Sequence, residues 1–226
     1  MSAKRSGGLF RASSGAGAAA QTRHYAGRTD ELARQLQAEL RVPSGGPRGA
    51  PALVALIGLP GSGKTHAARI LAARLGAAHV ASDELRSRLF VAASYAPQEN
   101  STIFACLDTL VEALLRERHR VVIDATHLSA SSRVAPVATV ARCGVPLVWV
   151  RIVADEAATL ERLGQRLVER AEHDHSDADR TIYERMRALP FKAPAGGYLE
   201  VVNGPDLLVE LERVAHHVEV LCAAAS

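Results

Sequence analysis

A three-layer α/β/α domain built on a parallel sheet is the fold class that this sequence of 226 residues predicts. Short apolar runs alternate with stretches whose apolar residues recur at helical spacing, which is typical of strands joined by crossover helices. The first apolar run, at 51–57, contains no charged residue, as expected of a strand buried on both faces. A glycine-rich turn and an Ala- and Leu-rich helical pattern follow it. We therefore expect a five-stranded parallel sheet covered by helices on both faces.

The expected elements follow one another with short connections. Strands are expected at 51–57, 77–81, 120–124, 145–153 and 199–203. Helices are expected at 66–75, 84–90, 98–119, 129–143, after 155, after 176 and at 206–221. Gly76 and Gly144 should each end a helix, and Pro136 should interrupt the helix at 129–143. Functional groups should gather where the strands end, at 58–65, 82–86, 124–127 and 203.

The first 49 residues differ in composition from the rest. Residues 1–27 hold no acidic residue and are rich in Ser, Gly, Ala and Arg. That composition is typical of a disordered basic tail, our preferred interpretation, and also of an organelle transit peptide. A short amphipathic helix is expected at 28–41, and the Pro and Gly residues at 43–47 indicate a linker. The sequence thus predicts a tail with helix and linker at 1–49 and a folded domain at 50–226.

Composition narrows the functional classes. No apolar run approaches the roughly 20 residues that a membrane-spanning helix needs, so no membrane association is expected. The three cysteines are scattered, which favours a reducing cytoplasm and predicts neither a disulfide framework nor a zinc site. A net charge of +3 does not by itself imply nucleic-acid binding, and an aromatic content of 4% counts against a broad nucleic-acid groove.

The most specific motif is the loop between the first strand and its helix, which fits the phosphate-binding pattern G-x-x-x-x-G-K-[ST]. In such a loop, backbone N–H groups and a helix N-terminus surround phosphate oxygens. Lys64 should reach the outer phosphates, and the Thr65 hydroxyl should hold Mg²⁺. We therefore predict binding of ATP and Mg²⁺. The nucleotide contacts predicted from the loop are Gly58, Pro60, Gly61, Ser62, Gly63, Lys64 and Thr65.

The apolar strand at 120–124 ends in an aspartate, which is the form of a Walker B strand. Asp124 is expected to support Mg²⁺; the alternative is a cap at the strand end. Ala125, Thr126 and His127 come next, where a motor ATPase commonly has a glutamate that activates water. The lack of that glutamate favours transfer of phosphate to an acceptor over hydrolysis.

The second strand ends at Ser82-Asp83, followed by a helix. A carboxylate at position 83 can take the proton of an attacking hydroxyl group. Arg86 lies three residues on, so it shares a helix face with Asp83 and can hold a phosphate or carboxylate of the acceptor. The alternative for Asp83 is an ordinary helix start with an acidic first turn.

Three arginines recur every four residues, at Arg162, Arg166 and Arg170, and so share one helix face. Such a helix can act as a lid whose arginines neutralise a phosphoryl group in transfer; a solvated helix face is the alternative. Asn203 ends the last strand, where it either contacts the adenine or turns the chain. The roles of His173 and His175, which flank an aspartate, stay open.

Together these segments resemble the P-loop kinases grouped with polynucleotide 5′-kinase, gluconate kinase and zeta toxin. The nearest resemblance is to small AAA-type ATP-binding domains. The matching segments are 58–65, 82–86, 122–127, the arginine lid and 176–179, within a resemblance that covers about 52–205. The resemblance implies the P-loop NTPase fold.

The resemblance also implies roles for particular residues. Asp83 matches the general base, and Arg86 matches the arginine that touches the acceptor's phosphate. Asp124 matches the aspartate that supports this arginine. Thr126 and His127 match residues of the acceptor site, although polynucleotide kinases frequently have Asn at the position of His127.

The implied activity is transfer of the γ-phosphate of ATP to a hydroxyl group. The catalytic residues expected for it are Lys64, Asp83, Arg86, Asp124 and Arg166, with Arg162, Arg170 and Asn203 as further nucleotide contacts. A polynucleotide 5′-hydroxyl is the preferred acceptor, and a hydroxyl of a sugar, antibiotic or nucleotide-sugar is the alternative. A different class is an ATP-binding switch that transfers nothing and is read by a partner protein. The oligomeric state stays open.

Overall fold

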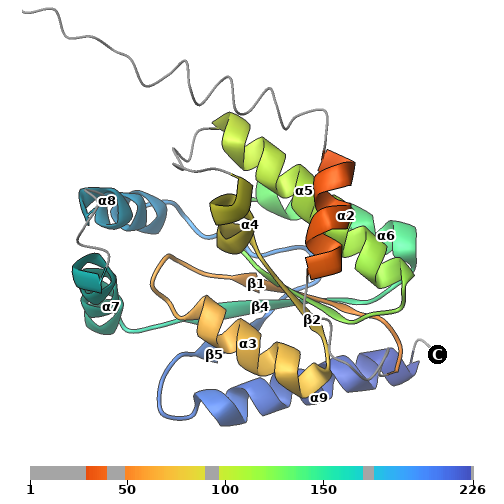
Figure 1. Ribbon diagram of the computed structural model, residues 1–226. Coiled ribbons are helices and arrows are strands. Elements are labelled where there is room, and N and C mark those ends of the chain that lie inside the picture. The colour runs from red at the N-terminus through yellow and green to blue at the C-terminus, as the bar shows by residue number, and fades with distance from the viewer. Residues whose placement is uncertain (1–28, 40–48, 90–96, 170–175, 225–226) are drawn as a thin grey trace, which may run out of the picture.

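The computed structural model describes residues 29–39, 49–89, 97–169 and 176–224. Within these ranges, parallel strands form a five-stranded sheet in the order β2-β3-β1-β4-β5 (Figure 1). The strands are β1 (Leu53–Ile57), β2 (Ala78–Ala81), β3 (Val121–Asp124), β4 (Leu147–Val153) and β5 (Leu199–Val202). The helices are α2 (Thr29–Glu39), α3 (Lys64–Leu75), α4 (Ser82–Leu89), α5 (Pro97–Arg116), α6 (Val134–Cys143), α7 (Glu156–Glu169), α8 (Ser176–Arg187) and α9 (Leu207–Ala224). The predicted fold class is confirmed.

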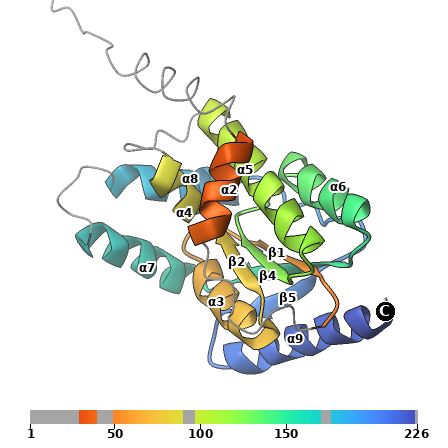
Figure 2. The ribbon, with the colours of Figure 1, turned by 45° about the vertical axis from the view of Figure 1, so that its right-hand side comes forward.

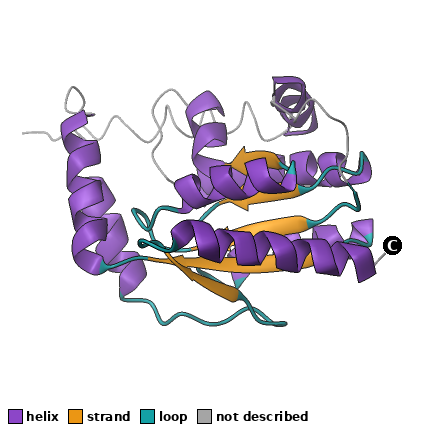
Figure 3. Cartoon of the chain, turned by 90° about the horizontal axis from the view of Figure 1, so that it is seen from below, coloured by secondary structure: helices purple, strands orange, loops and turns teal. Residues whose placement is uncertain are grey.

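Two hydrophobic layers enclose the sheet. On one face, α3 and α9 pack against side chains such as Val54 and Val150, and Figure 3 shows these two helices in front of the strands. On the other face, α2, α4, α5 and α6 pack against side chains such as Leu53 and Trp149. Every residue of β1 is buried because the central strand is covered from both sides.

Helices α7 and α8 stand apart from these layers, at the edge where the strands end (Figure 2). Helix α7 follows β4 directly, and Asp155 caps it by accepting a hydrogen bond from the Ala158 N–H at 3.1 Å. The two helices therefore border the sheet edge that carries the candidate functional groups.

The helix expected at 28–41 is present as α2, and it packs onto α5 instead of standing apart from the core. Ala33 and Leu36 are buried among the apolar side chains of the α5 layer. Gln37 donates a hydrogen bond of 2.8 Å to Glu117, just beyond the end of α5. The hydrophobic core thus begins earlier in the chain than Ala50, where composition suggested its start.

Pro136 does not interrupt a helix, which corrects the expectation at 129–143. A short 3₁₀ turn spans Ser131–Arg133, and α6 begins only at Val134. Pro136 therefore lies in the first turn of α6, where the N–H group that proline lacks would have no partner within the helix.

Among the helices in the described ranges, none has the length and hydropathy that crossing a membrane requires.

Candidate active site

The loop between β1 and α3 needs its glycines for backbone reasons. Gly61 and Gly63 have φ values of 75° and 91°, in the left-handed region that side chains disfavour. Gly58 is limited by space instead, because a Cβ there would lie 2.7 Å from the carbonyl oxygen of Ile152. The loop can therefore bring its backbone N–H groups close to a ligand.

Several polar groups of the loop are available to a ligand. Gly63 is the N-cap of α3 and makes no side-chain cap, so the first N–H groups of the helix are left for another acceptor. Lys64 is 9% exposed, and its Nζ donates a hydrogen bond of 2.8 Å to the carbonyl of Leu59 across the loop. The buried Ser62 Oγ has no hydrogen-bond partner among the described residues. The Lys64 ammonium, the Ser62 hydroxyl and the helix N-terminus together fit an anionic ligand.

Helix α7 holds the loop from one side. Arg162 donates a hydrogen bond of 2.9 Å to the carbonyl of Gly61. Thr159 and Leu163 pack so closely that a Cβ on Gly61 would lie 3.0 Å from each side chain. The structure thus brings Arg162 to the loop backbone, and its contact with a nucleotide stays a prediction. The side chain of Arg166 and all of Arg170 lie outside the described part of the chain, so their lid roles stay predictions.

Asn203 holds the loop from the end of β5. Its Nδ2 donates a hydrogen bond of 2.9 Å to the carbonyl of Ser62, and its backbone N–H donates one of 2.7 Å to Val153. The side-chain amide donor therefore contacts the loop backbone, a role that sequence reasoning missed. Contact of this residue with an adenine ring stays a prediction.

Asp124 lies under the start of α3. It is 6% exposed, and the Thr65 hydroxyl is near enough to lower the pKa of its carboxyl group. His79 Nε2 lies 3.7 Å from Asp124 Oδ2, which is longer than a hydrogen bond and leaves an electrostatic contact. Burial by itself raises the pKa of Asp124, but His79, Thr65 and Lys64 outweigh it, so the pKa is lowered. The carboxylate is therefore ionised beside the Thr65 hydroxyl, an oxygen pair of the kind that Mg²⁺ prefers.

The segment after Asp124 joins β3 to β1. The carbonyl of Thr126 accepts a hydrogen bond of 3.1 Å from the Gly58 N–H. His127 is 0% exposed; its Nδ1 pairs with the carbonyl of Leu56 at 2.9 Å, and its ring meets Trp149 edge-on at 5.4 Å. Burial lowers the pKa of His127 to about 4. The expected contact of His127 with an acceptor is therefore wrong: a side chain without exposed surface supports the core.

Asp83 lies in the first turn of α4, directly after β2, and is exposed. Its strand is two places from β1 in the sheet, so the strand ends lie about 10 Å apart at the usual spacing. Arg86 is only 6% exposed, and its Nη2 donates a hydrogen bond of 2.6 Å to Asn100 Oδ1. Its Nη1 lies 3.7 Å from Glu99 Oε2. Residues of α5 thus contact Arg86, in place of the support expected from Asp124.

Glu99 and Asn100 were missed by sequence reasoning, although Glu99 left a signal. It precedes Ile103 by four residues, as Ile103 precedes Leu107, so helical spacing places Glu99 on the buried face of α5. Glu99 is 1% exposed, and a carboxylate buried to this degree needs a cationic partner. Nothing in the sequence indicates that this cationic partner is Arg86.

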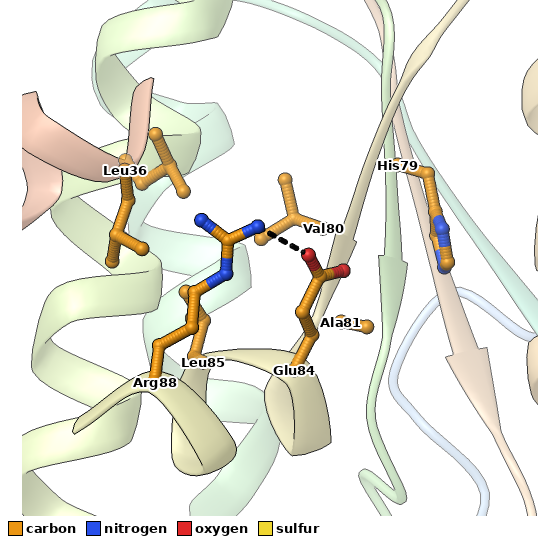
Figure 4. A pocket seen from close by; sticks show the side chains of 8 residues that line it. Leu36, His79, Val80, Ala81, Glu84, Leu85 and Arg88 are labelled. Carbon is orange, nitrogen blue, oxygen red and sulfur yellow. Dashed lines mark hydrogen bonds and ion pairs between the residues drawn. The ribbon is translucent and has the colours of Figure 1, made fainter. Parts of the chain in front are cut away.

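A small hollow lies away from the phosphate loop, between α2, β2, α4 and α5 (Figure 4). Leu36, Val80 and Leu85 line it, and Arg88 pairs with Glu84 at 2.8 Å beside it. Its volume of about 20 Å³ holds a water molecule but no nucleotide.

Among the described residues, no three His, Cys, Asp or Glu side chains gather as metal ligands. His173 and His175 lie outside those residues.

The fold and the loop define a P-loop protein of the α/β/α class. The sequence model of a family described as an AAA domain (AAA_33) matches residues 53–191. The chain therefore belongs to this family. A search of curated proteins gave no match.

Solved structures share the fold. Kti12 of Chaetomium thermophilum, solved in complex with ADP-AlF3, is 20% identical with a TM-score of 0.60, and the match covers 75% of this chain and 98% of that one. APS kinase CysC of Mycobacterium tuberculosis, in complex with AMPPNP and APS, is 19% identical with a TM-score of 0.57, covering 76% and 99%. A chain of the Pnkp1/Rnl/Hen1 RNA repair complex is 24% identical with a TM-score of 0.50, covering 64% and 48%. At these identities the likeness establishes the fold, and with the family match it confirms the resemblance to P-loop kinases.

Proposed function

We propose that this protein is an ATP- and Mg²⁺-dependent phosphotransferase that moves the γ-phosphate of ATP to a hydroxyl acceptor. The observation that carries the proposal is the position of the buried, ionised Asp124 beside Thr65, below a phosphate loop whose Lys64 is also buried. The exposed Asp83 lies in the first turn of α4, directly after β2. Phosphate-binding groups and a proton acceptor therefore border the same edge of the sheet.

The nucleotide half of the proposal rests on the loop. The N–H groups of residues 61–65 and the ammonium of Lys64 would hold the phosphates. Lys64 would exchange its hydrogen bond with the Leu59 carbonyl for phosphate oxygens. Thr65 and Asp124 would hold Mg²⁺, which when bound neutralises charge on the phosphates. Arg162, already hydrogen-bonded at Gly61, would act on the transferred group, together with Arg166 one turn further along α7.

The acceptor half rests on Asp83. The acceptor's hydroxyl oxygen forms a bond to the γ-phosphorus, its proton passes to the Asp83 carboxylate, and the bond from that phosphorus to the bridging oxygen breaks to release ADP. Ala125 follows Asp124 in place of a glutamate that would activate water, which supports transfer over hydrolysis. The sequence favours a polynucleotide 5′-hydroxyl as the acceptor, with a sugar, antibiotic or nucleotide-sugar hydroxyl as the alternative.

An ATP-binding switch is the rival proposal, and Asp83 separates the two. A switch needs the loop, Lys64 and Asp124 to sense the nucleotide, but it needs no proton acceptor at position 83. In such a switch, the basic tail and helix α2 would be the docking segment for a partner protein. Since Ala33 and Leu36 are buried against α5, α2 has less apolar surface to offer a partner, which supports the enzyme.

The proposal is tested with ATP labelled at the γ-phosphate, Mg²⁺ and a panel of 5′-hydroxyl oligonucleotides, sugars and aminoglycosides. We expect label on at least one hydroxyl acceptor. Lys64→Ala should abolish the labelling, and Asp83→Asn should lower its rate by about 10²–10⁴, as expected for loss of a general base. Glu84→Gln is the matched control, because it removes a neighbouring exposed charge and should leave the rate within about twofold. Label found only as free phosphate, or full transfer by Asp83→Asn, would contradict the proposal.

A further inference from the structure

The state of Arg86 bears on the chemical class of the acceptor. Its side chain is buried, hydrogen-bonded to Asn100 Oδ1 at 2.6 Å, and 3.7 Å from Glu99 Oε2. Glu99 itself is 1% exposed. A buried arginine with a buried carboxylate beside it forms a pair of no net charge. An anionic acceptor would have to displace that carboxylate and leave it buried without its partner, which is costly.

The other charged side chains of α4 do not attract an anion either. Arg88 is paired with Glu84 at 2.8 Å (Figure 4). Asp83 is exposed and is the proposed proton acceptor. Over the described part of this helix the cations are therefore matched by carboxylates, and Asp83 adds one negative charge. A phosphate on the acceptor would be repelled by Asp83 and by the triphosphate, whereas an uncharged acceptor would not.

Arg86 has another task that its contacts explain. Helix α4 has eight residues, and its buried apolar side chains are Leu85 and Leu89. The hydrogen bond from Arg86 to Asn100 adds a directional contact between α4 and α5. Because Asp83 lies three residues before Arg86, this contact fixes the rotation of α4 and hence the direction of the Asp83 carboxylate.

We infer that the acceptor is an uncharged hydroxyl compound, and that Arg86 is a positioning residue, held by Glu99 and Asn100, which orients Asp83 and binds no acceptor phosphate. The inference rests on the proposed function and reverses the order of acceptors that sequence resemblance favours. A neutral sugar or nucleoside hydroxyl comes first, and a polynucleotide end comes second.

Matched acceptor pairs that differ by one phosphate test the inference on the wild-type protein. Thymidine and thymidine 3′-monophosphate share the same 5′-hydroxyl, and glucose and glucose 1-phosphate share the same 6-hydroxyl. With labelled ATP and Mg²⁺, we expect kcat/KM to be at least as high for the neutral member of any pair that is labelled. A preference of about tenfold or more for the phosphate-bearing member, about 1.4 kcal/mol, would overturn the inference while leaving the phosphotransferase intact. No labelled acceptor in the whole panel would overturn both.

Two variants separate positioning from binding. Arg86→Gln should lower kcat for the neutral acceptor and leave the ratio of kcat/KM within each pair unchanged, since Arg86 contacts no acceptor phosphate. Glu99→Gln removes the neutralising charge and should raise kcat/KM for the phosphate-bearing member about tenfold relative to the neutral one. Asn100→Ala is the control that weakens the anchor without freeing charge, and it should lower kcat alone. A fall of kcat/KM in Arg86→Gln that is larger for the phosphate-bearing member than for the neutral one would show that the guanidinium binds the acceptor phosphate and would overturn the inference.

Discussion

The side-chain amide of Asn203 donates a hydrogen bond of 2.9 Å to the backbone carbonyl of Ser62. This contact joins the end of β5, the last strand of the sheet, to the phosphate loop, which follows the first strand. Arg162 of α7 donates a hydrogen bond to the neighbouring carbonyl, that of Gly61. Adjacent loop carbonyls are thus held by side chains of two elements that lie far apart in the sequence. The shape of the loop depends on residues outside the motif.

We expect Asn203→Ala to weaken nucleotide binding. Loss of a hydrogen bond of about 1 kcal/mol should raise the Kd for AMPPNP about fivefold, because the loop loses one of its supports. Asn203→Asp should be worse, since a carboxylate cannot donate to the Ser62 carbonyl and adds a negative charge near the phosphates. Isothermal titration measures both. Wild-type affinity in the alanine variant would show that the contact does not shape the loop.

Two glycines with positive φ allow backbone strain to be separated from steric collision. A Cβ on Gly63 (φ 91°) would collide with Nδ2 of Asn203, whereas a Cβ on Gly144 (φ 65°) meets nothing within 4 Å. Gly144→Ala should therefore cost only the strain, about 1–2 kcal/mol of unfolding free energy, and bind AMPPNP normally. Gly63→Ala should also abolish AMPPNP binding. Equal binding by the two variants would contradict the close contact at Gly63.

Helix α2 should contribute to the stability of the whole domain. Leu36 is 7% exposed within the α5 layer, so Leu36→Ala should lower the free energy of unfolding by about 2–4 kcal/mol. Gln35→Ala, at an exposed position of the same helix, should change it by less than about 0.5 kcal/mol. Urea denaturation measures both. Equal stability of the two variants would show that α2 does not pack as described.

Asp108 on α5 should make stability depend on pH. Burial raises the pKa of Asp108 from 3.8 to about 6, opposed by Arg142 and reinforced by Glu112. The folded state therefore binds more protons than the unfolded state between those values, and stability falls as pH rises through that window. Asp108→Asn removes the effect and should be more stable than wild type above pH 6 by on the order of 1–2 kcal/mol, because partial exposure reduces the full value. The difference should shrink toward pH 4.

Glu112→Gln is the control for that measurement. Hydrogen bonds from Arg142 and then Arg116 hold the pKa of Glu112 below its usual value. Its charge therefore stabilises the fold above the ordinary pKa of a glutamate, and the variant should be less stable than wild type at neutral pH. Denaturation curves for the two variants from pH 4 to 8 should move in opposite directions. A destabilised Asp108→Asn above pH 6 would contradict the assigned shift.

Local patterns were sufficient for the fold. Continuous apolar runs are typical of buried parallel strands, and the loop motif with its flanking strand and helix predicted both the site and the topology around it. The position of Asp124 at a strand end followed from the same pattern. Pro136 misled the helix prediction because a proline within a helical pattern can equally lie in a first turn.

The contacts between distant segments could not be predicted from the sequence alone. Arg86 is three residues from Asp83, and that spacing fits acceptor binding as well as an anchor. Only the packing of α4 against α5 reveals Glu99 and Asn100 as its partners. The family resemblance placed His127 in the acceptor site, yet its neighbours Leu56 and Trp149 come from β1 and β4. The roles of Arg86 and His127 depend on tertiary contacts, which a local sequence pattern does not reveal.

A crystal structure with AMPPNP and Mg²⁺ tests the central claim most directly, because it locates the terminal phosphate relative to Asp83. We predict that the triphosphate lies on the N–H groups of residues 61–65, with Lys64 released from the Leu59 carbonyl and the Asp83 carboxylate facing the γ-phosphorus across the end of β3. A nucleotide bound elsewhere, or an Asp83 side chain directed away from the γ-phosphorus, would contradict the account.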